Sequence, residues 1–230
     1  MALLDRIMGL FQSTTKLDGR YYGVYSGIVT DNKDPDALAR VKVLVASVSS
    51  AALWARTATP MAGKQRGTWF VPEVDDEVLV AFEGGDPRRP YVVGSLWNST
   101  ATPPETMDND NSRKSIVTRS GARIMVEETN KSTVMVLQTP AGQQVVLEDA
   151  GAPSVTIKDA NGNTIVLNSS GITVNSSGAV KVQATTVDVT ASMVKVNSGM
   201  SEFSGVVKCD TLIATSVVAT SYTPGAGNVM

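Results

Sequence analysis

The chain has 230 residues, of which 5% are aromatic and 18% are charged, and its formal net charge at pH 7 is -2. A nearly neutral chain is a poor candidate for a partner bound mainly through phosphate groups. The sequence contains no histidine, which excludes a Ser-His-Asp or Cys-His catalytic set and a histidine-ligated zinc or iron site. We therefore predict no cofactor, no metal site and no enzymatic activity.

Residues 1–19 form an N-terminal segment with one apolar stripe. Its large apolar residues follow helical spacing and predict a short helix: Leu3, Leu4, Ile7, Met8 and Phe11. The stripe is too short to span a bilayer and lacks the basic start of a signal peptide. Because so short a helix is marginal alone, we expect it to dock on its own trimer or on a partner protein. We also expect the chain to be assembled in the cytoplasm.

Residues 20–98 read as five strands separated by strong turns. The strands are YYGVYSGIVT, ALARVKVLVAS, LWARTAT, EVLVAFE and PYVVGSLW. Five strands without a covering helix predict a small closed barrel of the OB type. The barrel region has nine basic and nine acidic residues and no basic stripe with interleaved aromatics, which argues against binding of single-stranded nucleic acid.

Residues 99–112, STATPPETMDNDNS, read as a linker, and the chain then becomes repetitive over residues 113–221. Apolar pairs recur, and from residue 179 their spacing settles near seven. Since residues i and i+2 of a strand share a face, each pair points inward and the residue between them points outward. The outward residues alternate in charge every seven positions, which predicts an outer charge ladder or simply a solvated surface: Lys181, Asp188, Lys195 and Glu202.

One such short strand buries too little apolar surface to offset the entropy of ordering its backbone. The repeats must therefore share a core, either as a single-chain β-solenoid or as three chains wound about one axis. Both arrangements satisfy the pattern. The residues predicted to form this core are Ile165, Leu167, Ile172, Val174, Val180, Val182, Val187, Val189, Val194 and Val196.

Several motifs in the barrel region resemble the phage baseplate assembly protein V family, a module that also occurs in the valine-glycine repeat spikes of type VI secretion. They are an RVKV strand at 40–43, Trp54 with Arg56, a G-x-x-x-x-P loop at 67–72, EVLV at 77–80, GDPRRP at 85–90 and a G-x-x-x-N ending at 94–98. The segments TPAG, LEDAG, VTIKDANGN and IVLNSSGITV are similar to the stem of those spikes. The resemblance spans roughly residues 20–225.

The resemblance implies an all-β homotrimer with a five-stranded OB barrel followed by an intertwined triangular β-helix needle. It further implies the central spike of a contractile tail or injection particle, which closes the tube and pierces the target envelope. A separate hub protein would bind at the barrel end, as a partner on which the N-terminal helix could dock, and a PAAR-like tip protein would cap residues 222–230. The residues expected at the tip contact are Tyr222, Pro224, Gly225, Gly227 and Met230.

Other residues have two interpretations. Six side chains are candidates for contacts with the hub or a neighbouring barrel, although they also suit core or turn positions: Tyr21, Tyr22, Trp54, Trp69, Arg88 and Arg89. The acidic turn at 73–77 would serve a cell-wall hydrolase, but solvated carboxylates are common in turns. A trimeric tail-fibre adhesin is the other alternative function.

Overall fold

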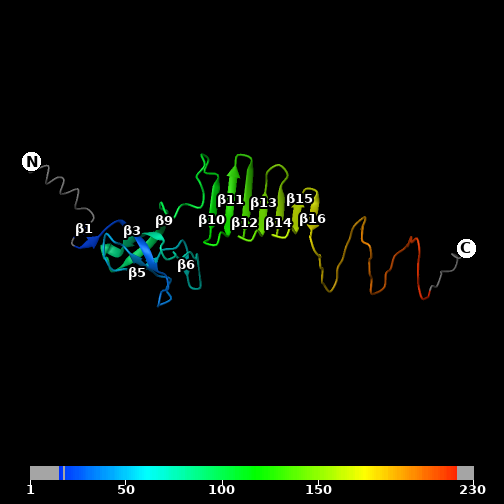
Figure 1. The fold of residues 1–230 in the computed structure, drawn as a ribbon, viewed down its shortest axis with the longest axis horizontal. Coiled ribbons are helices and arrows are strands. Elements are labelled where there is room, and N and C mark those ends of the chain that lie inside the picture. Colours follow the sequence, from blue (N-terminus) through cyan, green and yellow to red (C-terminus); the bar gives the residue numbers. More distant parts are fainter. Residues whose placement is uncertain (1–15, 18, 222–230) are drawn as a thin grey trace, which may run out of the picture. The chain divides into compact units, whose positions relative to one another are not determined.

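The computed structural model describes residues 16–17 and 19–221, and the predicted N-terminal helix and the tip segment lie outside that part. The described residues are almost entirely strands and turns (Figure 1). Their one helical element is the short 3-10 turn η1 (Glu83–Gly85). Among these residues, no helix has the length and apolarity needed to cross a bilayer. The chain consists of two units whose boundary lies between Ala179 and Val180.

Five strands close into a barrel in the order β3-β4-β5-β9-β8, with β8 pairing back to β3. They are β3 (Val24–Asp31), β4 (Val41–Leu44), β5 (Leu53–Thr57), β8 (Glu77–Phe82) and β9 (Pro90–Leu96). All neighbours are antiparallel except β5 and β9, which run parallel. The five predicted strands and the predicted barrel are thus confirmed.

The barrel core is almost entirely valine, because each strand turns alternate side chains inward. In β8, Val78 and Val80 are fully buried while their neighbours are partly exposed. Gly27 lets β3 approach β4 closely, since a Cβ there would lie 2.7 Å from Val43 Cγ1. The other buried members of the core are Val29, Val41, Val45, Ala55, Phe82 and Val92.

The loop between β3 and β4 is organised by the Asp34 carboxylate. It accepts hydrogen bonds from the backbone N–H groups of Asp36, Leu38 and Arg40. It also pairs with the Arg40 guanidinium at 2.6 Å, and only 4% of its side chain is exposed. The bonds from Arg40 hold the pKa of Asp34 well below its usual range.

Two small hairpins flank the barrel: β1 (Lys16–Leu17) with β2 (Arg20–Tyr21), and β6 (Ala62–Gly63) with β7 (Arg66–Gly67). After residue 112 the chain forms a 7-stranded antiparallel sheet whose strands follow sequence order, so β10 and β16 are its edges. The strands are β10 (Arg113–Val117), β11 (Arg123–Thr129), β12 (Ser132–Gln138), β13 (Gln144–Glu148), β14 (Ser154–Lys158), β15 (Thr164–Asn168) and β16 (Gly171–Asn175).

Three connections of this sheet repeat one loop design, in the sequences TRSGA, TPAGQ and DANGN. The first residue, Thr118, Thr139 or Asp159, accepts a bond from the N–H of the residue four positions later through its side-chain oxygen. The fourth residue is a glycine whose φ lies between 87° and 93°, a conformation that glycine adopts without strain. The design explains why Gly recurs in this half of the sequence.

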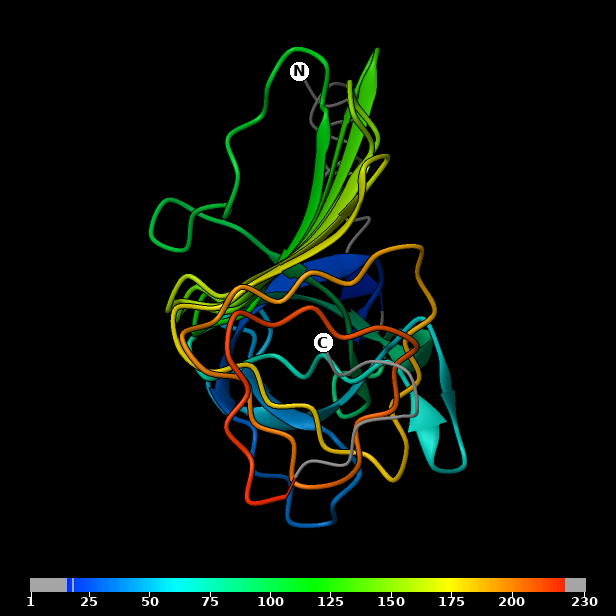
Figure 2. The ribbon, with the colours of Figure 1, turned by 90° about the vertical axis from the view of Figure 1, so that its right-hand side faces the viewer.

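The segment from 176 to 221, called the needle segment below, contains no strand among the residues that the structure describes. Figure 1 draws it in yellow to red as an extended zigzag without arrows, and Figure 2 shows the same trace curving round repeatedly. Within the described part of the chain, no strand pairs with the short strands expected here. A strand needs a neighbouring strand to satisfy its backbone groups, which is what additional copies of the chain would supply.

Candidate assembly interface

The 7-stranded sheet has one strongly apolar face. The register pairs Ile116 with Ile124, Ile124 with Leu137, and so on through all seven strands. This builds an unbroken aliphatic row, and a second apolar row runs parallel to it, two residues away on each strand from β11 to β16. Together they define the apolar face: Ile116, Ile124, Leu137, Val145, Ile157, Ile165 and Val174, then Val126, Met135, Leu147, Val155, Leu167 and Ile172.

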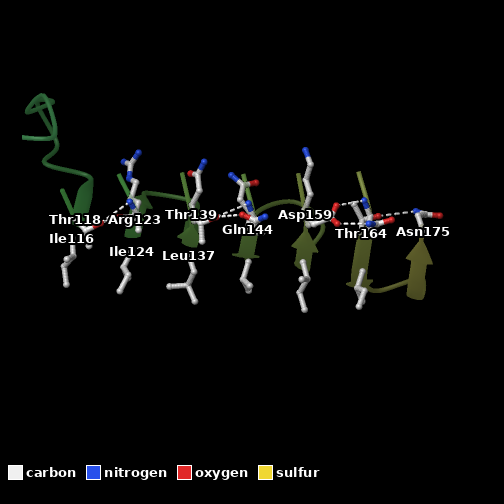
Figure 3. A pocket seen from close by; sticks show the side chains of 18 of the residues that line it. Ile116, Thr118, Arg123, Ile124, Leu137, Thr139, Gln144, Asp159, Thr164 and Asn175 are labelled. Atoms are coloured by element: carbon white, nitrogen blue, oxygen red, sulfur yellow. Dashed lines mark hydrogen bonds between the residues drawn. The ribbon is translucent and has the colours of Figure 1, made fainter. Parts of the chain in front are cut away.

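The apolar face is largely uncovered within one chain. In the first row the exposed fraction is 52% for Ile124 and 49% for Leu137, and in the second row it is 71% for Ile172. Figure 3 shows Ile116, Ile124 and Leu137 projecting together, away from Arg123. A groove of about 710 Å³ lies along these strands. So large an exposed apolar surface is typical of an interface between proteins.

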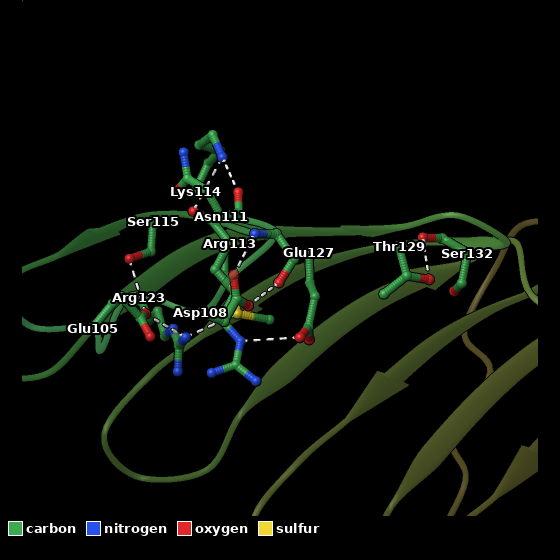
Figure 4. Close-up of polar contacts among 12 residues, drawn as sticks. Glu105, Asp108, Asn111, Arg113, Lys114, Ser115, Arg123, Glu127, Thr129 and Ser132 are labelled. Atoms are coloured by element: carbon green, nitrogen blue, oxygen red, sulfur yellow. Dashed lines mark hydrogen bonds and ion pairs between the residues drawn. The ribbon is translucent and has the colours of Figure 1, made fainter.

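The opposite face is mixed and partly covered. It carries the polar row Arg123, Gln138, Gln144 and Lys158 on the successive strands β11 to β14. The linker before the sheet is fastened here, because Glu105 Oε1 accepts hydrogen bonds from Ser115 Oγ at 2.9 Å and from Arg123 Nη2 at 2.5 Å (Figure 4). An ion pair of 3.0 Å joins Arg113 and Glu127 across β10 and β11. The linker therefore leaves the apolar face free.

In the needle segment the aliphatic side chains fall into two groups by exposure. Those at the predicted core positions keep part of their surface shielded, with exposed fractions of 63% for Val187 and 73% for Val182. Others are exposed almost completely, such as Val206 at 98% and Val218 at 97%. The first group therefore lies on the more shielded side of the segment, and the second group lies on its more exposed side.

The sequence-predicted core residues thus lie in two settings. Ile165 and Val174 are cross-strand partners on the apolar face, as are Leu167 and Ile172. The six valines between 180 and 196 share the partly shielded side of the needle segment. The earlier members of the apolar face, in β10 to β14, were not among the predicted core residues. Alternation of apolar and polar residues within each of those strands is the signal that would have found them.

The six barrel candidates separate into different environments. Tyr21 packs on the barrel core, with its ring 6.1 Å from that of Phe82. The Arg40 guanidinium lies 5.7 Å from the ring of Trp54. Tyr22 is 45% exposed and Trp69 is 76% exposed.

The two arginines of GDPRRP are engaged within their own turn. Arg88 pairs with Asp86 at 2.8 Å and Arg89 pairs with Glu83 at 3.1 Å. The hydrogen bonds from Arg88 hold the pKa of Asp86 well below its usual range. Contacts of the six candidates, these two arginines included, with a hub or another barrel stay predictions.

Carboxylates of the acidic turn at 73–77 accept hydrogen bonds that hold the local fold. Asp76 accepts a hydrogen bond from the Glu73 backbone N–H at 2.8 Å, and Glu77 accepts one from the Asn98 amide at 2.8 Å. Asp75 has a φ of 74°, as expected for a tight turn. In the described part of the chain, no group of three or more His, Cys, Asp or Glu side chains is placed so that it could bind a metal ion.

Comparison with known families follows this division of the molecule. Residues 25–97 match the type VI secretion system/phage-baseplate injector OB domain. Residues 134–201 match the phage baseplate V C-terminal trimerisation domain. The two matches lie in order and together take in more than half of the chain. The chain belongs to the phage baseplate V family. Its trimerisation domain contains most of the apolar face and the first part of the needle segment, and it supports a homotrimer.

Curated relatives share part of this baseplate V chain. It is 36% identical over 75 residues to the type VI secretion system spike protein VgrG3 of Vibrio cholerae, which is 30% of this chain and 7% of that protein. It is 31% identical over 74 residues to the spike protein VgrG1a of Pseudomonas aeruginosa, covering 32% and 12%. It is 39% identical over 54 residues to the actin cross-linking toxin VgrG1 of Vibrio cholerae, covering 24% and 5%. The chain thus spans only a small fraction of these relatives.

Proposed function

We propose that three copies of this chain form the central spike of a contractile tail or injection particle. In this role the spike closes the distal end of the tube and is driven through the target envelope when the sheath contracts. The observation that carries the proposal is the pairing of an injector OB domain with a trimerisation domain whose apolar face is open in a single chain. Spike proteins of type VI secretion among the relatives support the same role.

The mechanical logic follows from where the apolar side chains lie. Three copies that turn their apolar faces and needle valines toward one axis share a dry core that none has alone. Protein cores are packed as densely as organic crystals, so such a rod resists compression along its length. The outside keeps Lys181, Asp188 and Lys195 in water. The chain would thus transmit force and perform no chemistry of its own.

Two partners complete the proposal. A separate hub protein would contact the barrel, where the side chains of Tyr22 and Trp69 are exposed and are candidates for that contact. Aromatic side chains in such positions are common anchors of protein interfaces. A PAAR-like tip protein would dock on residues 222–230. Deleting 222–230 is expected to abolish capture of the tip protein while native mass spectrometry still finds the trimer, and unchanged capture would refute the docking.

Electron cryo-microscopy of the parent particle tests the main proposal. With the chain present, density for the spike is expected on the tube axis, and that density disappears when its gene is deleted. Density at the periphery of the baseplate instead would identify a tail-fibre adhesin. Release of soluble fragments from peptidoglycan by the purified trimer would identify a hydrolase. Either result overturns the spike.

A further inference from the structure

Over three consecutive steps, the core of the needle segment carries no information about register. Consecutive seven-residue steps centred on Lys181, Asp188 and Lys195 each have a valine on both sides of the centre. A copy displaced by one step would therefore place valine on valine again. Sheets are prone to such slips wherever the buried pattern repeats without change. Some other feature has to select one register.

The centres of the steps are the residues that differ. The flanking valines lie on the shielded side, with Val187 at 63% and Val189 at 66% exposure, so the centre between them faces the solvent side. Among the residues that the structure describes, Asp188 forms no ion pair within its own chain, and the same is true of Lys181 and Lys195. These charges are available to other copies.

Three-fold symmetry fixes which centres become neighbours. With each copy starting on a different face of a triangular needle, every step moves a copy to the next face and raises it by one strand spacing. A face then carries one step from the first copy, the next step from the second and the following step from the third. Neighbouring centres on a face are consecutive in the sequence and belong to different copies.

We propose that the alternating charges of Lys181, Asp188, Lys195 and Glu202 set the register between the three copies. In the correct register each centre stands beside an opposite charge of another copy. A slip by one step places lysine beside lysine and carboxylate beside carboxylate. Directly opposed like charges disfavour a strand pairing, as charge patterns do in coiled coils. This inference rests on the proposed three-chain needle and concerns its alignment only.

Disulfide cross-linking in the full-length protein measures the register. Thr185 and Ser192 occupy equivalent corner positions one step apart. With Cys209 replaced by serine, the double variant T185C/S192C is expected to form interchain disulfides in the correct register. The single variant T185C brings two thiols together only after a slip. The ratio of cross-linked chain in the double and single variants therefore reports alignment, and native mass spectrometry reports the trimer independently.

The decisive comparison is between breaking the alternation and inverting it. D188K is expected to lower that ratio several-fold, and D188N is expected to lower it less. The fourfold reversal K181E/D188K/K195E/E202K keeps the alternation and should match the parent. High salt should narrow the gap between D188K and the parent by screening. A parent-like ratio for D188K at low salt, or a D188K-like ratio for the fourfold reversal, overturns the register proposal while the trimer stands. Absence of a trimer in the parent would instead overturn the needle itself.

Discussion

The barrel and the needle segment use the same amino acid in opposite ways. Val29, Val41, Val78 and Val80 are completely buried inside the barrel, whereas Val187 in the needle segment is 63% exposed. Both follow the alternation of an extended strand. The difference is the source of the opposite wall, which the barrel takes from its own chain and the needle lacks. Valine at period two predicts a buried face, but not which molecule covers it.

The sharpest way to break this comparison is to place a charge on the shielded side of the needle. V187D would bury three carboxylates around the trimer axis, and each unpaired buried charge costs several kcal/mol. We expect loss of the trimer in native mass spectrometry. V218D is the matched control, since Val218 is 97% exposed and should accept the charge. A trimer that survives V187D would contradict a shared interior.

The apolar face of the sheet provides the next test. If three copies bury it, L137A should destabilise the trimer by about 2–5 kcal/mol per copy, the usual loss for a covered leucine. The neighbouring Q138A lies on the opposite face and serves as the control. Denaturant unfolding of the trimer measures both. Equal, small effects would mean that the face stays in water after assembly.

A core substitution in the barrel should lower its stability to the same extent whether or not the trimer is assembled. V80A removes two methyl groups from a fully buried site and is expected to cost about 2 kcal/mol. Because the barrel supplies its own core, its melting temperature should fall by the same amount at low and high protein concentration. The melting of the needle should shift with concentration, as binding linkage requires. A concentration-dependent shift for V80A would show that the barrel also relies on its neighbours.

The smallest expected effect is the loss of barrel stability at acidic pH. The folded-state pKa of Asp34 is depressed by Arg40, so the stabilisation is present above the unfolded Asp pKa of about 3.9 and is lost as pH falls below it. D34N removes this contribution. Thermal melts of the barrel between neutral pH and strong acid should be steeper with pH for the parent than for D34N. Parallel curves would contradict a native ion pair.

The sequence predicted the barrel better than it predicted the sheet. The five barrel strands are long, alternate cleanly and are bounded by turns such as GGDPRRP, so local patterns are sufficient. The strand count predicted a closed barrel, but the parallel pairing of β5 with β9 joins residues far apart in the chain and could not be read from local patterns. The meander of β10 to β16 was harder, because its apolar residues recur at irregular spacing across loops of two to five residues.

Part of the candidate interface could not be predicted from the sequence, for a physical reason. The inward side of the needle valines follows from period two and stays a prediction until a shared core is observed. The fastening of the linker by Glu105 to Ser115 and Arg123 does not follow from composition, since STATPPETMDNDNS has the residues of a free spacer. Side-chain pairing across unrelated segments leaves no periodic signal.

The two open edges of the sheet, β10 and β16, matter for how the protein is made. A newly synthesised monomer exposes both unpaired edge strands beside a large apolar surface. This combination promotes aggregation. The yield of correctly assembled protein therefore depends on how soon after translation three copies associate. Synthesis of several copies on one polysome would shorten the time before assembly. Synthesis at a low rate or a low local concentration would lengthen that time.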